Sequence, residues 1–299
     1  MSIPHFRSSD AGASAPAAVT FQTLQQKKQT GRPITALTAY DYATARLVDE
    51  AGIDLILVGD SLAMVVMGYD STLPVTMEEM LHHTRAVRRA VRRAIVAADM
   101  PYGSYQKNVD EGVANAVRFV KEAGAQAVKV EGGASRAELV ERLTAAEINV
   151  IGHLGLMPQS VNRMGGYKVQ GKSAAAIGEL LHDAHTLEAA GAAMIVLEGI
   201  PREVAARITS EVGIPTIGIG AGPDCDGQIL VFHDLVNLSF SPPAKFARPY
   251  GDAAALFRQA IEGYRSDVEE RSFPSDDESY HLPKETAPAL ADATMRRRA

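Results

Sequence analysis

One pattern recurs along the chain and constrains its fold more than any other feature. The segments EAGIDLILVGD (50–60), EAGAQAVKVEG (122–132) and EAAGAAMIVLEG (188–199) each join the end of a helix to an apolar run that finishes on an acid. Glycine tolerates the left-handed backbone conformation that closes a helix. An unbroken apolar run is typical of a parallel strand that is buried on both faces. The pattern therefore predicts repeated helix–strand units.

The same pattern, followed over the whole chain, gives eight candidate strands with helical stretches between most of them. Eight strand–helix units in about 250 residues is the size of a (β/α)8 TIM barrel, so the expected fold class is α/β. A doubly wound sheet is the alternative, but it needs a switch point and no segment marks one. The expected strands are TALTAY (35–40), DLILVGD (54–60), AIVAAD (94–99), AVKVEG (127–132), NVIGHL (149–154), MIVLEG (194–199), PTIGIG (215–220) and LVNLSF (235–240).

Composition narrows the class of protein. The 299 residues carry a formal net charge of -6, which argues against a nucleic-acid partner. No apolar run approaches the roughly 20 residues of a membrane span. The single cysteine, Cys225, excludes an internal disulfide and suits a reducing compartment. Residues 1–20 are expected to form a disordered leader, residues 21–270 a single barrel domain, and residues 271–299 a largely loose extension.

Acids stand at or near the ends of five expected strands. In a barrel of this class, the carboxyl ends of the strands form the active face. Five acids in these places exceed the share expected from 36 acidic residues among 299. We therefore expect a cluster of carboxylates at one end of the barrel. The five are Asp41, Asp60, Asp99, Glu131 and Glu198.

A structural role is the alternative for these acids, because acids also cap helices. For Asp60 and Glu131 this alternative is weak, since Thr76 and Ser135 are the expected caps of the helices that follow. For Asp41 the two interpretations remain equally open.

Carboxylates that converge repel one another unless a cation lies among them. Oxygen ligands without a cluster of cysteine or histidine favour Mg²⁺, which shares its ligand shell with water and oxygen-rich substrates. Lys129 precedes Glu131 by two residues, so both face the same side of their strand and Lys129 can balance negative charge. His153, near the end of the fifth strand, has no assigned role. These residues predict a Mg²⁺-dependent enzyme acting on an oxygen-rich anion, and they leave the reaction open.

The segment GYKVQGKS (166–173) matches the pattern of a phosphate-binding loop. Such a loop needs a strand directly before it, and the preceding MPQSVNRMG is no strand. We expect instead a long loop after the fifth strand, of the kind that often covers an active site.

Seven motifs together resemble the ketopantoate hydroxymethyltransferase family, and the likeness runs from about residue 20 to about residue 282. The motifs are TAYDY (38–42), VGDSL (58–62), GYDSTLPVT (68–76), KVEGG (129–133), GHLGLMPQS (152–160), GGYKVQG (165–171) and IGIGAG (217–222).

This resemblance implies a barrel of the phosphoenolpyruvate/pyruvate type and a one-carbon transfer. The implied reaction moves a hydroxymethyl group from 5,10-methylene-tetrahydrofolate to 3-methyl-2-oxobutanoate. It gives 2-dehydropantoate through a Mg²⁺-stabilised enolate, in the first committed step of pantothenate and coenzyme A biosynthesis. The resemblance also implies a cytoplasmic homodecamer.

The same resemblance implies a role for each residue at a matching position. Asp60 and Asp99 match the Mg²⁺ ligands, with Glu131 as the third carboxylate of the metal site. Glu198 matches the catalytic proton acceptor. The positions that hold the oxo acid are those of Asp60, Ser61, Asp99 and Lys129.

Two other functions remain as alternatives. One is a Mg²⁺-dependent lyase or aldolase that acts on oxo acids without folate, and dependence on folate separates it from the transferase. The other is a non-catalytic barrel whose acids serve metal-linked stability or assembly, which any turnover would exclude.

Overall fold

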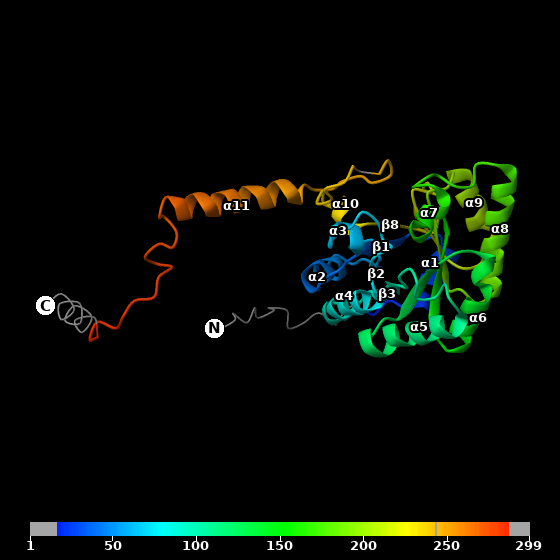
Figure 1. The fold of residues 1–299 in the computed structure, drawn as a ribbon, viewed down its shortest axis with the longest axis horizontal. Coiled ribbons are helices and arrows are strands. Elements are labelled where there is room, and N and C mark those ends of the chain that lie inside the picture. The colour runs from blue at the N-terminus through cyan, green and yellow to red at the C-terminus, as the bar shows by residue number, and fades with distance from the viewer. Residues whose placement is uncertain (1–16, 243, 287–299) are drawn as a thin grey trace. The chain divides into compact units, whose positions relative to one another are not determined.

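The computed structural model describes residues 17–242 and 244–286, and within them eight parallel strands close into a barrel in chain order (Figure 1). β1 pairs with β2 on one side and with β8 on the other, so the ring has no free edge. The expected (β/α)8 fold is confirmed. The strands are β1 (Ile34–Thr38), β2 (Leu55–Val58), β3 (Ile95–Asp99), β4 (Ala127–Glu131), β5 (Asn149–Gly155), β6 (Met194–Glu198), β7 (Thr216–Ile219) and β8 (Gly227–Leu230).

Helices cover the outside of the strands (Figure 1). The buried residues of α5, including Phe119, belong to the core between strands and helices, and α5 ends at Gly124 with φ of 71°. The α-helices are α1 (Phe21–Gln29), α2 (Tyr42–Glu50), α3 (Leu62–Val65), α4 (Met77–Ala90), α5 (Val109–Ala123), α6 (Ala137–Ala145), α7 (Val161–Met164), α8 (Ala174–Ala189), α9 (Arg202–Glu211), α10 (Phe232–Leu235) and α11 (Ala253–Glu269). Two 3₁₀ helices, η1 (Ala134–Arg136) and η2 (Pro158–Ser160), complete the set in the described residues.

A second apolar core fills the interior of the barrel. Along β2, Leu55 and Leu57 belong to this interior cluster, whereas Ile56 and Val58 belong to the core shared with the helices. This alternation follows from the two-residue period of a strand. Leu24 of α1 also packs in the interior cluster and is fully buried.

The eighth strand differs from the prediction. It is formed by Gly227–Leu230, whereas Leu235 ends α10 and no strand covers the predicted range 235–240. An apolar run alone does not separate a strand from other buried segments. Closure instead requires a chain that fits against β1, and a Cβ at Gly227 would collide with the carbonyl oxygen of Ile34. The absence of a side chain at Gly227 therefore allows this segment to lie close against β1.

The expected cap at Ser135 is also wrong. The residue before α6 is Arg136, and no side chain makes a capping hydrogen bond there. The carboxylate of Asp183, on α8, accepts a hydrogen bond of 2.7 Å from the backbone N–H of Ala134. A residue remote in the sequence therefore supplies the acceptor that we expected from a local motif.

The chain divides into two compact units. One contains the barrel and the segment Ser239–Tyr250, and the other contains α11 and the short segment Val236–Leu238. α11 therefore lies outside the barrel unit, although the predicted barrel domain extended to residue 270. In α11, the Asp252 side chain accepts a hydrogen bond from the N–H of Ala255.

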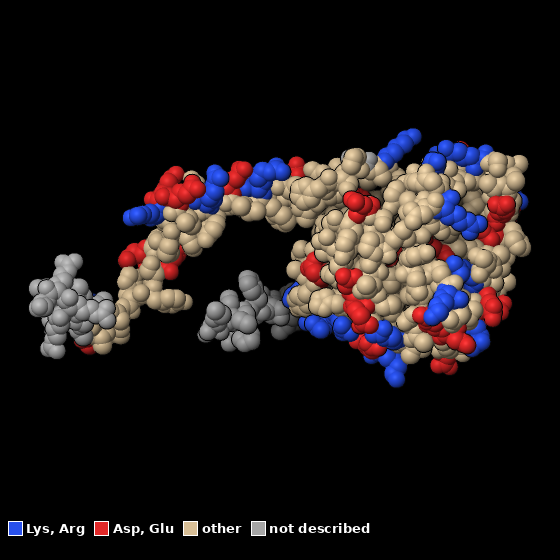
Figure 2. Space-filling model, viewed as in Figure 1, with Lys and Arg blue, Asp and Glu red and all other residues tan. Residues whose placement is uncertain are grey.

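The predicted leader falls mostly outside the described residues. Its end does not fit the prediction of disorder, because Val19 is buried and its N–H donates to the Arg93 carbonyl oxygen at 2.8 Å. Among the described helices, none is long and apolar enough to cross a membrane. On the face drawn in Figure 2, basic and acidic side chains are interspersed, without the basic stripe that typifies a nucleic-acid surface.

Candidate active site

The alternation of the strands sets which side chains reach the carboxyl end of the barrel. Ala127 of β4 lies in the interior core, so Lys129 and Glu131, two and four residues later, face the same way. Ile151 and Val196 also lie in the interior core, so His153 and Glu198, each two residues later, face the same way. Each of these polar residues continues an inward-facing apolar row.

Parallel pairing then brings these polar residues side by side. Asp99 pairs in register with Lys129, and Glu131 pairs with His153. The resulting mouth holds a cavity of about 940 Å³, lined by Asp60, Ser61, Asp99, Lys129, Glu131, His153 and Glu198. The structure therefore brings the predicted metal, substrate-binding and catalytic residues to one cavity, but it does not bring Asp41 there.

Asp60 and Asp99 lie against each other at the ends of β2 and β3. The backbone N–H of Asp60 donates to Oδ2 of Asp99 at 3.0 Å, and the amide of Gln159 donates to Oδ2 of Asp60 at 2.9 Å. Burial raises the pKa of Asp60 well above its usual range, and repulsion from Asp99 and Glu131 adds to the effect. The mouth is thus a place where further negative charge is costly and a cation would be favoured.

Lys129 supplies positive charge beside these acids. Its Nζ lies 2.9 Å from Oδ1 of Asp99, in a direction that leaves this oxygen without a hydrogen bond. Burial lowers the pKa of Lys129, but Asp99, Glu131 and Asp60 outweigh it and the net change is a rise. Lys129 therefore stays charged inside the barrel.

His153 lies between two carboxylates. Nδ1 is 3.4 Å from Oε1 of Glu131 and 3.3 Å from Nζ of Lys129, and Nε2 is 3.2 Å from Oε2 of Glu198. Burial and Lys129 lower the pKa of His153, while Glu131 and Glu198 raise it, and the outcome is a pKa of about 9. The pKa of Glu131 is lowered, because His153 and Lys129 outweigh its burial.

The donors fit an open magnesium site better than a closed one. No three His, Cys, Asp or Glu side chains in residues 17–242 and 244–286 already converge as a metal cage. Mg²⁺ commonly takes one or two carboxylates and completes its shell with water and substrate oxygens. Asp60 and Asp99, joined by one hydrogen bond and lining an open cavity, match that requirement.

Two further predicted residues have clear positions. Oγ of Ser61 lies 2.8 Å from the hydroxyl of Tyr40, which is buried, so the Ser61 hydroxyl is held at the cavity wall. Asp41 is different, because its carboxylate accepts hydrogen bonds from the N–H and the hydroxyl of Thr44 and caps α2. The structural alternative for Asp41 is the one that holds.

The loop between β5 and α8 contains the segment that matches a phosphate-binding loop. As expected, no strand lies directly before it, and the short helix α7 precedes it instead. Tyr167 and Val169 of this loop line the cavity.

Several residues of the cavity and its support do not follow from the sequence patterns. Gln159 is buried and donates to the carboxylate of Asp60, and the hydroxyl of buried Tyr105 accepts from the backbone N–H of Glu131. Thr72 is a buried cavity residue whose hydroxyl has no hydrogen-bond partner in the described structure. Gln159 and Thr72 lie within the motifs GHLGLMPQS and GYDSTLPVT, which were the available signal. Nothing local to Tyr105 pointed to the site.

Comparison with known proteins agrees with this geometry. The profile of the family described as "Ketopantoate hydroxymethyltransferase" matches residues 18–276. The 3-methyl-2-oxobutanoate hydroxymethyltransferase of Koribacter versatilis (strain Ellin345) is 64% identical over 281 residues, which are 94% of this chain and 95% of the relative. The protein of the same name from Geotalea daltonii is 52% identical over 264 residues, 88% of this chain and 99% of the relative.

Solved structures share the fold at low sequence identity. Phosphonopyruvate hydrolase in complex with oxalate and Mg²⁺ has a TM-score of 0.57 at 17% identity, covering 93% of this chain and 97% of that one. 2,3-Dimethylmalate lyase, of the PEP mutase/isocitrate lyase superfamily, has a TM-score of 0.57 at 18% identity, covering 94% and 95%. These matches agree with the (β/α)8 barrel fold.

Proposed function

The chain belongs to the ketopantoate hydroxymethyltransferase family, an enzyme family of pantothenate biosynthesis, and from this premise we propose how its barrel mouth works. The reaction transfers a hydroxymethyl group from 5,10-methylene-tetrahydrofolate to 3-methyl-2-oxobutanoate, giving 2-dehydropantoate. The observation that carries the proposal is the convergence of Asp60, Asp99, Lys129, Glu131 and Glu198 on one cavity at the carboxyl end of the strands.

Asp60 and Asp99 hold Mg²⁺ in this proposal, with Glu131 as the third carboxylate of the metal site. The hydrogen bond from the backbone N–H of Asp60 to Asp99 supports it, because it holds the Asp99 carboxylate next to Asp60. The raised pKa of Asp60 also supports it, because burial and repulsion from Asp99 and Glu131 make a cation favourable there. When bound, Mg²⁺ would polarise the carbonyl of the oxo acid and make the neighbouring C–H more acidic.

Asp60, Ser61, Asp99 and Lys129 bind the oxo acid. Lys129 donates from Nζ to the keto oxygen as negative charge develops there, and its burial strengthens that interaction. Tyr40 holds the Ser61 hydroxyl in position through their 2.8 Å hydrogen bond. Both side chains are therefore positioned before substrate arrives.

Glu198 is the proton acceptor. Its side chain is 17% exposed and stands at the end of β6, on the cavity wall. Nε2 of His153 lies within ion-pair distance of Oε2, at 3.2 Å, so we assign to Oε1 the proton from carbon 3 of the oxo acid. Carbon 3 then bonds to the one-carbon unit of the folate. Both C–N bonds of that unit break, the oxygen of a water molecule becomes the new hydroxyl, the two folate nitrogens take the protons of the water, and the proton held by Glu198 passes to the hydroxyl.

The proposal extends to the assembly and the compartment, a cytoplasmic homodecamer. Support for association between copies comes from α11, whose large apolar side chains Leu256, Phe257, Ile261 and Tyr264 are at least half exposed. Sedimentation equilibrium measures the number of copies directly, and a monomer would contradict this part.

The deciding experiment is proton NMR of 3-methyl-2-oxobutanoate in D₂O with the enzyme, with and without Mg²⁺, and without folate. We expect the carbon-3 proton signal to disappear only with Mg²⁺. Glu198→Gln should abolish the exchange, whereas the matched change Glu203→Gln, on an exposed side chain of α9, should not.

The experiment also separates the alternatives. Exchange that requires added tetrahydrofolate would mean that folate completes the site. No exchange of the carbon-3 proton, with or without tetrahydrofolate, would contradict the transferase mechanism and favour the folate-independent lyase. That lyase has weaker support, because the solved lyase shares only the fold with this chain at 18% identity.

A further inference from the structure

Gln159 is a neutral side chain buried among the charges of the mouth, with 6% of its surface exposed. Its amide uses its full hydrogen-bonding capacity of two donors and two acceptors. Oε1 accepts from the Tyr105 hydroxyl at 2.7 Å and from Nε2 of Gln106 at 2.9 Å. Nε2 donates to Oδ2 of Asp60 at 2.9 Å and to the carbonyl oxygen of Met100 at 2.9 Å. Such an amide has one orientation.

Tyr105 sets that orientation. Its hydroxyl oxygen accepts from the backbone N–H of Glu131 at 3.0 Å, so the hydroxyl proton is free to donate to Oε1 of Gln159. A flipped amide would direct an N–H at the other N–H donor, Nε2 of Gln106, and a carbonyl oxygen at the acid Asp60. The backbone of β4 therefore determines, through Tyr105, which end of the amide meets Asp60.

Gln159 also contacts a second acid through its main chain. Its backbone N–H donates to Oε2 of Glu131 at 3.0 Å. One residue thus holds one oxygen of Asp60, after β2, and one oxygen of Glu131, at the end of β4. Because Gln159 is uncharged, it fixes both carboxylates without neutralising them, unlike Lys129 or His153.

We propose that Gln159 is a positioning residue for the divalent cation, holding Asp60 and Glu131 in their binding orientation, and that Tyr105 sets its amide. This inference rests on the proposed Mg²⁺ site. Groups that orient metal-binding side chains typically change metal affinity by 10- to 100-fold when they are removed.

The test measures binding of Mn²⁺ alone by electron paramagnetic resonance, without substrate or folate. Gln159→Met keeps the length of the side chain but removes its donors, and we expect about 10- to 100-fold weaker Mn²⁺ binding by the folded protein. Gln159→Glu, which adds a fourth acid to Asp60, Asp99 and Glu131, should not restore it. The matched control is Gln170→Met, because the side chain of Gln170 donates its hydrogen bond to the carbonyl oxygen of Lys168 and none to the acids of the mouth. This control should bind Mn²⁺ like the unchanged protein.

Tyr105→Phe provides a second, independent variant if Gln159→Met fails to fold. It should weaken Mn²⁺ binding by a smaller factor, and in a Gln159→Met background it should cause no further loss, because both changes break one chain of hydrogen bonds. Thermal unfolding of each variant separates lost stability from lost metal affinity.

The outcomes distinguish this inference from the proposed function. If the unchanged protein binds no Mn²⁺, the proposed metal site fails. If it binds Mn²⁺, and folded Gln159→Met or folded Tyr105→Phe binds equally well, only the positioning role is overturned. Additive losses in the double variant would contradict the link through Tyr105.

Discussion

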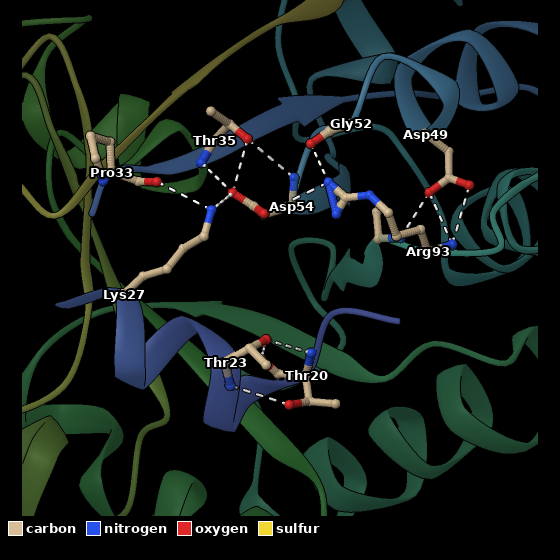
Figure 3. A network of polar contacts seen from close by, with 10 residues as sticks. Thr20, Thr23, Lys27, Pro33, Thr35, Asp49, Gly52, Asp54 and Arg93 are labelled. Atoms are coloured by element: carbon tan, nitrogen blue, oxygen red, sulfur yellow. Dashed lines mark hydrogen bonds and ion pairs between the residues drawn. The ribbon is translucent and has the colours of Figure 1, made fainter. Parts of the chain in front are cut away.

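The two ends of the barrel both bury carboxylates, but they treat them differently. At the amino end, Oδ2 of Asp54 accepts from Lys27 at 2.6 Å and from the N–H and hydroxyl of Thr35, while Arg93 lies 3.7 Å from Oδ1 (Figure 3). Asp226 repeats the arrangement with Lys28 and Thr216. Each of these acids has its own cation and its own hydrogen-bond donors.

Asp49, a third acid at this end, is satisfied by backbone hydrogen-bond donors alone. Its carboxylate accepts from the backbone N–H groups of Arg92, Arg93 and Ala94 and so holds the turn before β3 (Figure 3). These hydrogen bonds satisfy the carboxylate within the fold.

At the carboxyl end, several carboxylates share few cations, so their negative charge is only partly neutralised. Lys129 is within ion-pair distance of Asp99, and His153 serves both Glu131 and Glu198. In the described part of the chain, Asp60 has no cation within ion-pair distance. Acids at the amino end therefore stabilise the fold, whereas acids at the mouth keep an unmet demand for positive charge, which suits them for binding a cation.

The largest test of this contrast is catalytic activity. Asp99→Ala should lower kcat/KM by about 10³-fold, because it removes a proposed metal ligand and the partner of Lys129. Asp54→Asn, at the other end, should change kcat/KM by less than about twofold. Steady-state kinetics with 3-methyl-2-oxobutanoate measures both. Titration calorimetry should show weaker Mg²⁺ and oxo-acid binding in Asp60→Ala and Asp99→Ala, and normal metal affinity in both would refute the ligand assignment.

The gain in stability from Mg²⁺ should depend on the acids at the carboxyl end and not on those at the amino end. Saturating the mouth with Mg²⁺ at about 100 times its Kd should stabilise the protein by about 2.7 kcal/mol, because the cation binds the folded state. Asp60→Asn should lose this gain and Asp54→Asn should keep it. Thermal unfolding with Mg²⁺ and with a chelator gives the comparison. An equal gain in both variants would place the metal elsewhere.

Without metal, neutralising an acid should reduce stability at the amino end but not at the carboxyl end. Asp54→Asn should lower the free energy of unfolding by about 2 kcal/mol, since it leaves Lys27 without its carboxylate in a partly buried place. Asp60→Asn should raise it by about 1 kcal/mol, because it relieves repulsion while its amide oxygen still accepts from Gln159. Urea unfolding in chelator measures both changes. Equal losses in the two variants would remove the distinction between the ends.

The smallest effect concerns pH. Burial raises the pKa of Asp54, but hydrogen bonds from Lys27 and Thr35 outweigh it, so its pKa is lowered on folding. A lowered pKa contributes stability that is present above the unfolded value of about 3.9 and is lost as pH falls through the folded value. The stability difference between the unchanged protein and Asp54→Asn should therefore shrink below about pH 4. A difference that stays constant from pH 6 to pH 3 would contradict this reading.

Much of the fold followed from patterns that are local in the sequence. The repeated apolar runs predicted β2, β4 and β6, and the period of two in KVE predicted that Lys129 and Glu131 would face the same side. Local rules failed where packing decided between similar segments. The run 235–240 is as apolar as a strand, yet Gly227 fits against Ile34 and closes the ring.

The sequence by itself determined that acids would end the buried strands, because strand period and the shared direction of parallel strands are local and repeated properties. Only the tertiary structure decided how those acids are held. Gln159 lies 99 residues from Asp60, and Asp183 lies 49 residues from Ala134. No pattern of spacing encodes these hydrogen bonds, since their lengths depend on barrel closure, which brings distant loops within about 3 Å of one another.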